Sequence, residues 1–245
     1  MDCATCGRSI PDGAPACVHC GAPTSKATDA APGAGAGGGA AIAPAVVPSA
    51  AVNRLVERVK AILLTPRTEW PRIAADATTA QDIYMRYVAP LVAIGIVASF
   101  IGHVLVGVPI PLLGTVRLGI GAALAAGIVH FVLTFVAVFV IALIVDALAP
   151  TFGGRKDPLS ALKVTAYSFT PGWVAAILTI LPVLGPIAGL IGLYGLYLMY
   201  LGLPVLMGAP KDKALGYTVV VVLCAIVLSI VVSMVSGLVT GGYAV

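Results

Sequence analysis

The chain has 245 residues, of which 60% are hydrophobic and only 10% are charged, and its mean hydropathy is +1.06. An ordinary soluble domain carries roughly 25% charged residues, and a chain this poor in charge cannot cover a globular surface with polar groups. The composition, with a formal net charge of +4, therefore excludes a soluble enzyme, a nucleic-acid-binding domain and a disordered chain, and it predicts an all-α polytopic membrane protein.

The first element in chain order is a cysteine-rich segment at residues 1–22, with two CxxCG knuckles separated by ten residues. Two residues between paired cysteines let a tight turn direct both thiolates at one ion, and four thiolates suit tetrahedral Zn²⁺. We expect a structural zinc ribbon; two disulfides and a rubredoxin-like iron site are the alternatives. The four expected ligands are Cys3, Cys6, Cys17 and Cys20.

Residues 23–50 form an Ala/Gly/Pro-rich tract without apolar periodicity, which we interpret as a flexible, disordered linker. Residues 52–76 follow as a juxtamembrane amphipathic segment whose apolar side chains fall at helical spacing opposite basic ones. Such a helix lies in the interface of an anionic leaflet or packs on neighbouring protein, and the pattern leaves both interpretations open. Pro66 is expected to end the helix at Thr65, and Trp70 to act as an interfacial anchor.

Five membrane spans are predicted within residues 80–240, because each apolar run is long enough to cross the hydrocarbon layer. A capping-box-like sequence, Thr79 to Asp82, precedes the first span, and a tight turn at 182–186 joins the third span to the fourth. The spans are expected at about 85–106, 118–147, 164–182, 186–207 and 215–238.

The loop charges predict the orientation of these spans. Thirteen of the fourteen Lys and Arg residues fall on one side if the N-terminus is cytosolic, and Arg117 alone falls on the other. Cytoplasmic loops carry the excess of basic residues in membrane proteins. We therefore expect a multi-pass protein of a bacterial inner membrane, with a cytosolic N-terminus and, after five spans, a C-terminus outside.

Ionisable groups within spans are functional candidates by default. His130 lies near the middle of the second span and Asp146 near its inner end, about 24 Å further along a helix. We expect the His130 ring to bond another helix and Asp146 to reach the interface near Lys156 or Lys163. A proton relay would need further stations. Cys224 is expected to be a small apolar core residue.

Residues 161–235 carry short motifs in a distinctive order: Ala166-Tyr167, Thr170-Pro171, the turn around Pro182, Leu193-Tyr194, Tyr200-Leu201-Gly202, Pro204 and Lys213 to Tyr217. With the sequence ILLTPRTEWPR at 62–72, they resemble the membrane domain of the Yip (Ypt-interacting protein) family in its bacterial form, over about residues 52–240. The resemblance implies five spans and a cytosolic N-terminus. Eukaryotic members bind prenylated Rab-type GTPases, but their acidic motif before the first span is not evident here, so that function is not implied.

The sequence favours a non-enzymatic membrane scaffold or adaptor with a cytosolic zinc-ribbon module, since it contains no nucleophile–base pair, paired carboxylates or Gly-rich phosphate loop. A transporter or channel is the alternative, because prolines within the spans can expose backbone carbonyls. The expected partners are membrane lipids, a protein bound through the ribbon and a second copy of the chain, but no nucleic acid. The candidate interaction surface comprises Lys211, Lys213 and Tyr217.

Overall fold

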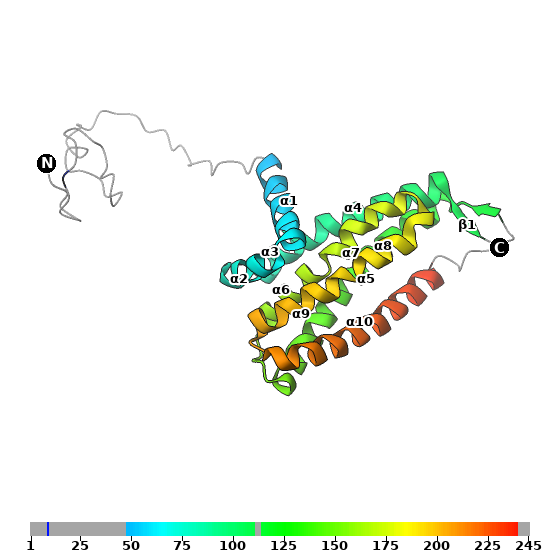
Figure 1. Ribbon diagram of the computed structural model, residues 1–245. Helices are drawn as coiled ribbons and strands as arrows, with labels where there is room; N and C mark the ends of the chain where they lie inside the picture. The colour runs from blue at the N-terminus through cyan, green and yellow to red at the C-terminus, as the bar shows by residue number, and fades with distance from the viewer. Residues whose placement is uncertain (1–8, 10–47, 111–113, 240–245) are drawn as a thin grey trace, which may run out of the picture. The chain divides into compact units, whose positions relative to one another are not determined.

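The computed structural model describes Ser9, residues 48–110 and residues 114–239, and the chain divides into two units, Met1–Ala45 and Val46–Val245. The predicted zinc ligands and most of the predicted linker lie outside the described residues. The second unit is a bundle of helices with one short antiparallel hairpin, formed by β1 (Val108–Ile110) and β2 (Gly114–Val116) (Figure 1). This arrangement confirms an all-α multi-pass class for the described part of the chain.

The segment before the first span folds as two helices, α1 (Pro48–Leu64) and α2 (Pro66–Ala75). The boundary at Thr65 confirms the prediction from Pro66, which occupies the first turn of α2, where its missing N–H costs nothing. Trp70 is only 1% exposed, so the expectation of an interfacial anchor is wrong. The sequence shows an aromatic residue near a span, but it does not show that α9 (Tyr194–Met207) packs over that residue.

The first two predicted spans are confirmed as long helical segments. The first runs through α3 (Ala80–Ile83), a π-helical turn η2 (Tyr84–Val88), α4 (Ala89–Ile101) and a second π-helical turn η3 (Gly102–Val106). Its capping box is present: the Thr79 side chain accepts from the Asp82 N–H and the Asp82 carboxylate accepts from the Thr79 N–H. The second span is α5 (Ile120–Leu148), an unbroken helix.

The predicted third span is not one helix. Residues 158–180 form α6 (Pro158–Ser168), α7 (Thr170–Ala175) and a 3₁₀ segment η5 (Ala176–Ile180). The break at Phe169 precedes Pro171, which supplies no N–H to the ladder and disfavours the helical region just before it. Four other segments of the described chain are long and apolar enough to cross a membrane: Ala80–Val106, Ile120–Leu148, Pro182–Met207 and Lys211–Val232.

The turn predicted at 182–186 contains a short 3₁₀ helix, η6 (Pro182–Leu184), followed by α8 (Gly185–Gly192) and α9. Helix α9 ends at Gly208, whose φ of +67° lies in the left-handed region that glycine adopts without strain. Helix α10 (Lys211–Val239) completes the bundle along α5 and α9. The predicted fourth and fifth spans are therefore present.

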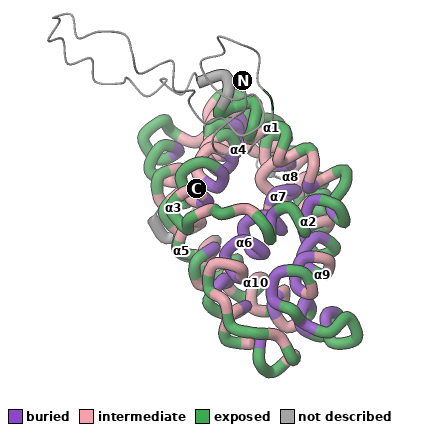
Figure 2. Tube along the Cα trace, turned by 90° about the vertical axis from the view of Figure 1, so that its left-hand side faces the viewer, coloured by how far each residue is buried: buried purple, intermediate pink, exposed green. Residues whose placement is uncertain are grey.

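Buried side chains concentrate on α6, α9 and the helices that face them, as Figure 2 shows. Eight consecutive residues of α6, from Ala161 to Ser168, are buried, so this helix lies at the centre of the bundle. On α5, by contrast, a stripe of large apolar side chains at helical spacing is about half exposed. That stripe suits contact with lipid and comprises Leu124, Ile128, Val132, Val136, Phe139 and Leu143.

Candidate functional site

Two features of the bundle bring polar side chains together, one at each end. The first involves Lys163 on α6, which is only 5% exposed. Its ammonium donates hydrogen bonds to the backbone carbonyls of Ile73, at 3.0 Å, and Asp76, at 2.7 Å. These carbonyls close the C-terminal turn of α2, where a cation also complements the helix dipole. Lys163 therefore holds the end of α2 against the middle of the bundle.

The same end of α2 carries the carboxylates that bind α1. Arg58 on α1 donates to Glu69 at 2.7 Å and also pairs with Asp76, while Glu69 is buried. Burial lowers the pKa of Arg58, but the Tyr167 phenol and the two carboxylates outweigh that effect, and the net pKa lies above its ordinary value. We call Arg58, Glu69, Asp76 and Lys163 the clasp, because together they join α1, α2 and α6.

Apolar contacts close beneath the clasp. Trp70 packs edge-on against Tyr167, with ring centroids 6.4 Å apart, and it lies over Gly202 of α9. A Cβ atom at Gly202 would lie 2.8 Å from the Trp70 ring, so only glycine permits this approach. The Tyr87 and Thr170 hydroxyls are 2.7 Å apart within the same core. The clasp thus rests on a packed interior rather than on solvent-exposed ion pairs.

Asp146 lies near the clasp end of α5, but its partner differs from the one expected. Its carboxylate accepts a hydrogen bond from the Asp157 backbone N–H at 2.8 Å, and Lys163 is bound to α2 instead. The Asp157 side chain in turn accepts from the N–H groups of Leu159 and Ser160 and caps α6. Asp146 therefore orders the loop that begins α6, and the expected neighbour Lys156 is an exposed residue.

The candidate surface of Lys211, Lys213 and Tyr217 is only partly a surface. Both lysines are exposed at the start of α10. Tyr217 is fully buried, stacks on Phe152 with centroids 4.9 Å apart, and donates its hydroxyl hydrogen to the Val145 carbonyl. Placing Tyr217 on an exposed surface is therefore wrong, because Tyr217 belongs to the buried face of α10, with Ala214, Thr218 and Val221, and α10 packs on α5.

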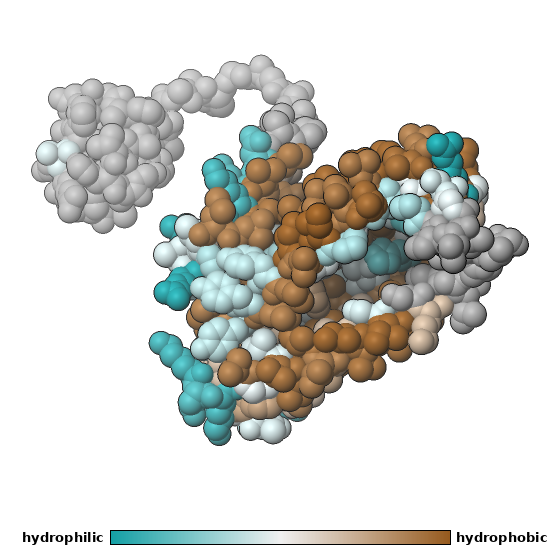
Figure 3. Space-filling model, turned by 45° about the vertical axis from the view of Figure 1, so that its right-hand side comes forward, coloured by the Kyte–Doolittle hydropathy of each residue, from teal (hydrophilic) through white to brown (hydrophobic). Residues whose placement is uncertain are grey.

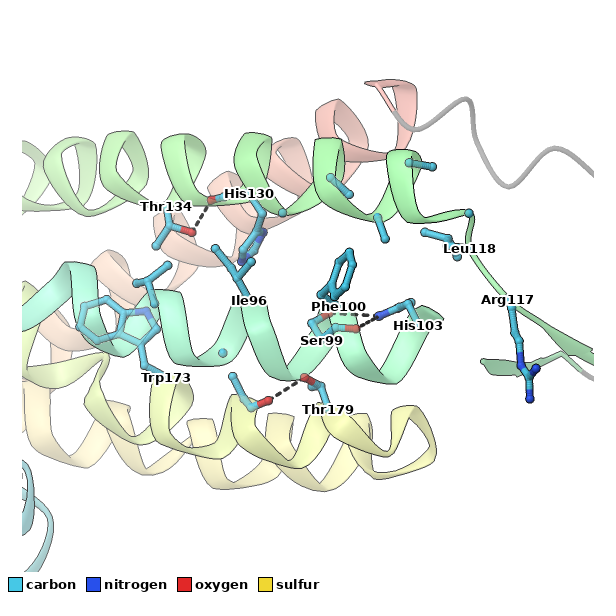
Figure 4. A pocket seen from close by; sticks show the side chains of 18 of the residues that line it. Ile96, Ser99, Phe100, His103, Arg117, Leu118, His130, Thr134, Trp173 and Thr179 are labelled. Carbon is cyan, nitrogen blue, oxygen red and sulfur yellow. Dashed lines mark hydrogen bonds between the residues drawn. The ribbon is translucent and has the colours of Figure 1, made fainter. Parts of the chain in front are cut away.

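The second polar feature is a cavity of about 670 Å³ between α4, α5 and the α7–η5 segment. Figure 4 shows His130 and Thr134 reaching it from α5, Ser99 from α4, His103 from η3, and Trp173 and Thr179 from the third segment. In Figure 3 a hollow with more hydrophilic atoms in its depth opens between two apolar ridges. The sequence singled out His130 but not this cavity, which arises from the packing of three distant segments.

Within the cavity most polar groups are held by their own helix. The His103 ring nitrogen Nδ1 lies 2.7 Å from the Ser99 carbonyl, and since a carbonyl only accepts, Nδ1 carries the hydrogen. Thr134 donates to the His130 carbonyl and Thr179 to the Ala176 carbonyl. Over the described residues the His130 ring makes no hydrogen bond, so the expected bond to another helix is not observed.

The described residues contain no cluster of three or more His, Cys, Asp or Glu side chains that could hold a metal ion. Cys224 on α10 is a free, partly buried thiol. Two groups of polar side chains therefore remain the candidates in the described part of the chain: those that attach α1 and α2 at one end of the bundle, and those that line the cavity towards the other.

Comparison with known proteins places this architecture in a family. Residues 60–234 match the family model described as the Yip1 domain, a range that contains the cavity and every clasp residue except Arg58, which lies just before it. No curated protein and no solved structure matches the chain. The match covers well over half of the sequence and includes the motifs that suggested the resemblance. The chain therefore belongs to the Yip1 domain family of multi-pass membrane proteins.

Proposed function

We propose that this protein is a non-enzymatic membrane scaffold or adaptor, whose membrane domain holds an N-terminal zinc ribbon at the cytosolic surface. The observation that carries the proposal is the clasp. Helix α1 follows the first unit directly in sequence, and Arg58 and Lys163 join α1 and α2 to the interior of the bundle. Buried charges are costly unless they are paired. The paired charges of the clasp hold α1 and α2 in place, which is the task of a scaffold.

The proposed zinc ribbon comprises Cys3, Cys6, Cys17 and Cys20, and its support is the spacing of the two knuckles. A ribbon with four sulfur ligands leaves no open position for a catalytic water, so its zinc would be structural. Its role in the scaffold is recognition of a partner protein. The membrane domain supplies the anchor and, with a second copy of the chain, a means of bringing two ribbons together.

We further propose that residues 158–180 make a fifth crossing, although they are broken into three elements. The segment begins near the clasp, where Lys163 contacts α2, and continues into η6, which contacts β1 at the other end of the bundle. Between these points it runs along α4, which packs on both α7 and η5. Together with the charge bias of the loops, this path supports a cytosolic N-terminus and an external C-terminus in a bacterial inner membrane.

The packing favours a scaffold over a transporter. Towards the clasp, the region between α4, α5 and α6 is filled by buried apolar side chains, including Val88, Ala142 and Ala166. The cavity therefore does not continue as a lined path to the clasp end of the described residues. A transporter requires access to its site from both sides of the membrane.

The proposal is tested by crosslinking in native membranes combined with flux measurements in liposomes. The intact protein is compared with a variant in which all four knuckle cysteines are serine. We expect a defined set of crosslinked proteins to disappear with the cysteines, and liposomes containing the protein to leak no faster than empty ones. Solute flux above the empty-liposome rate, or an identical crosslinked set without the cysteines, would contradict a scaffold that acts through the ribbon.

The exposed Lys211 and Lys213 remain a proposed contact for anionic headgroups, without Tyr217. Each lysine near an anionic surface contributes ~1 kcal/mol, and the contribution weakens with salt. A Lys211→Gln, Lys213→Gln double variant should retain less co-purified anionic lipid while keeping its orientation. Unchanged lipid content would restrict these lysines to fixing the topology.

A further inference from the structure

The cavity between α4, α5 and the α7–η5 segment has the properties of a binding site. Its volume of about 670 Å³ falls inside the range of roughly 300–1,000 Å³ that is typical of small-molecule sites, and most of its lining is apolar. Small residues on α5 leave the space open, since Ala122, Ala126 and Gly127 line it where larger side chains would fill it. The lining lies along two of the long apolar segments.

Among the described residues, the lining of the cavity carries positive charge and no negative charge. Arg117, between β2 and α5, is the one Lys, Arg, Asp or Glu residue among those that line the cavity. Its side chain is exposed, and in the described part of the chain no carboxylate lies within ion-pair distance of it. A cation without an acidic neighbour at the edge of an apolar cavity favours a ligand with an anionic head and an apolar tail.

Two further polar side chains, Ser99 and His103, line the cavity on the Arg117 side. Ser99 lies in the last turn of α4 and His103 in η3, on the same side of the cavity as Arg117 and Leu118 (Figure 4). Because Nδ1 of His103 donates its hydrogen to the Ser99 carbonyl, Nε2 of the neutral ring is an acceptor, and the donors for an anionic head come from Arg117. Further along, Leu91, Val92 and Ile96 provide an apolar stretch on α4. The site is thus amphipathic along its length.

We propose that this cavity binds an anionic membrane phospholipid, with the phosphate at Arg117 and one acyl chain between α4 and α5. A soluble anion would gain nothing from the apolar lining, and a headgroup without net negative charge would leave the positive charge of Arg117 uncompensated. The occupant is therefore a lipid of the leaflet on the side of the β1–β2 hairpin. This binding is independent of the proposed scaffold function and of the zinc ribbon.

The test uses the purified full-length protein in nanodiscs that contain equal amounts of phosphatidylglycerol and phosphatidylcholine. Lipids retained after extraction are counted per protein by native mass spectrometry. We expect one retained lipid, predominantly phosphatidylglycerol. Arg117→Gln should reduce the preference for phosphatidylglycerol about fivefold, which corresponds to one cation at an anionic headgroup, and high salt should reduce it in the parent.

Two neighbouring alanines provide a matched pair. Ala126 lines the cavity, whereas Ala125 is exposed on another face of α5 and does not line it. Ala126→Phe should abolish retention of the lipid, and Ala125→Phe should leave it unchanged. Equal retention of the two lipids by the parent, or full retention by Ala126→Phe, would overturn the proposal. A third contradiction is loss of binding in His130→Ala with no effect of Arg117→Gln, because the ligand head would then lie at the His130 end. The exposed position of Arg117 keeps its variant informative even if Ala126→Phe misfolds.

Discussion

At the scale of single residues, the clasp depends on a lysine that pairs with no carboxylate among the residues that the structure describes. Lys163 instead donates to the Ile73 and Asp76 carbonyls at the end of α2, and the Asp76 carbonyl also accepts from the Thr78 N–H at 3.0 Å. Removing the ammonium would leave the carbonyl of the buried Ile73 without this donor. Lys163 therefore stabilises the folded state mainly by supplying a hydrogen-bond donor to a buried carbonyl, because a buried acceptor without a donor is costly.

We expect Lys163→Met to destabilise the protein, because methionine fills similar space but donates no hydrogen bond. The loss should be roughly 2–3 kcal/mol, which lowers the midpoint of thermal unfolding by roughly 5–10 °C. Thermal denaturation in detergent measures it. Lys156→Met is the matched control, since Lys156 is an exposed lysine in the preceding loop and its variant should unfold like the parent. Equal midpoints for the two variants would show that Lys163 does not hold α2.

Gly195 on α9 provides a second test at this scale. A Cβ atom there would lie 2.5 Å from the Ser168 carbonyl oxygen, so Gly195→Ala must push α9 away from α6. Overpacking of this kind costs roughly 1–3 kcal/mol, and Gly195→Leu should cost more and lower the yield of folded protein. Gly189→Ala is the control, because no atom lies within 4 Å of its added Cβ. Comparable unfolding midpoints for Gly195→Ala and Gly189→Ala would refute the close approach.

At the scale of elements, the N-terminus of α6 is determined by one side chain. Asp157 accepts two backbone hydrogen bonds and the Ser160 hydroxyl, and the bond from Ser160 lowers the pKa of the Asp157 carboxyl below its ordinary value. A carboxyl with a lowered pKa in the folded state stabilises the fold above its unfolded pKa, near about 4. That contribution disappears as the pH falls through the lower, folded-state value.

Asp157→Ala should therefore cost ~1 kcal/mol at neutral pH, and Asp157→Asn, which keeps a capping oxygen, should cost less. The difference between the parent and the Asn variant should shrink as the pH falls below about 4, where the carboxyl becomes protonated. Urea denaturation at a series of pH values measures both effects. A difference that stays constant down to pH 2 would mean that the charge of Asp157 does not contribute.

Local signals predicted element boundaries well. The capping box at Thr79 and the proline at 66 act on neighbouring backbone groups, so the sequence alone is enough to predict their effect. The break in the third span was missed although Pro171 was visible, because a proline in a membrane helix is often accommodated without a break. Trp70 and Tyr217 were misplaced because their burial depends on α9 and α5, which are remote in sequence.

At the scale of the whole molecule, the sequence predicted the all-α membrane class and the family. The clasp and the cavity could not be predicted, because each joins segments that are distant in the sequence. In the sequence, Lys163 counts only as one of the basic residues that orient the spans, because its partners on α2 lie about ninety residues earlier. The cavity joins α4, α5 and η5, and no single segment carries a signal for it. His130 was the one cavity residue that its chemistry alone made a candidate.

The division of the chain into two units leads to a prediction about zinc. The purified protein should contain one Zn²⁺ per chain, and Cys3→Ser or Cys20→Ser should abolish binding. Because the knuckles belong to the unit Met1–Ala45, the unfolding midpoint of the membrane domain should not change when zinc is removed. Elemental analysis and thermal denaturation with and without a chelator measure these quantities. Absence of zinc from reduced protein would exclude the ribbon.

The central claim is that five crossings hold the N-terminal unit on the cytosolic side, with the broken segment 158–180 as the third. Four crossings would return the C-terminus to the side of the N-terminus, so the location of Val245 distinguishes the two topologies. Reporters active on only one side of the membrane are fused before Met1, at Arg155, at Lys211 and after Val245. Five crossings predict cytosolic signals from the first three reporters and an external signal from the last. A cytosolic reporter after Val245 would contradict it, because residues 158–180 would then not cross the membrane.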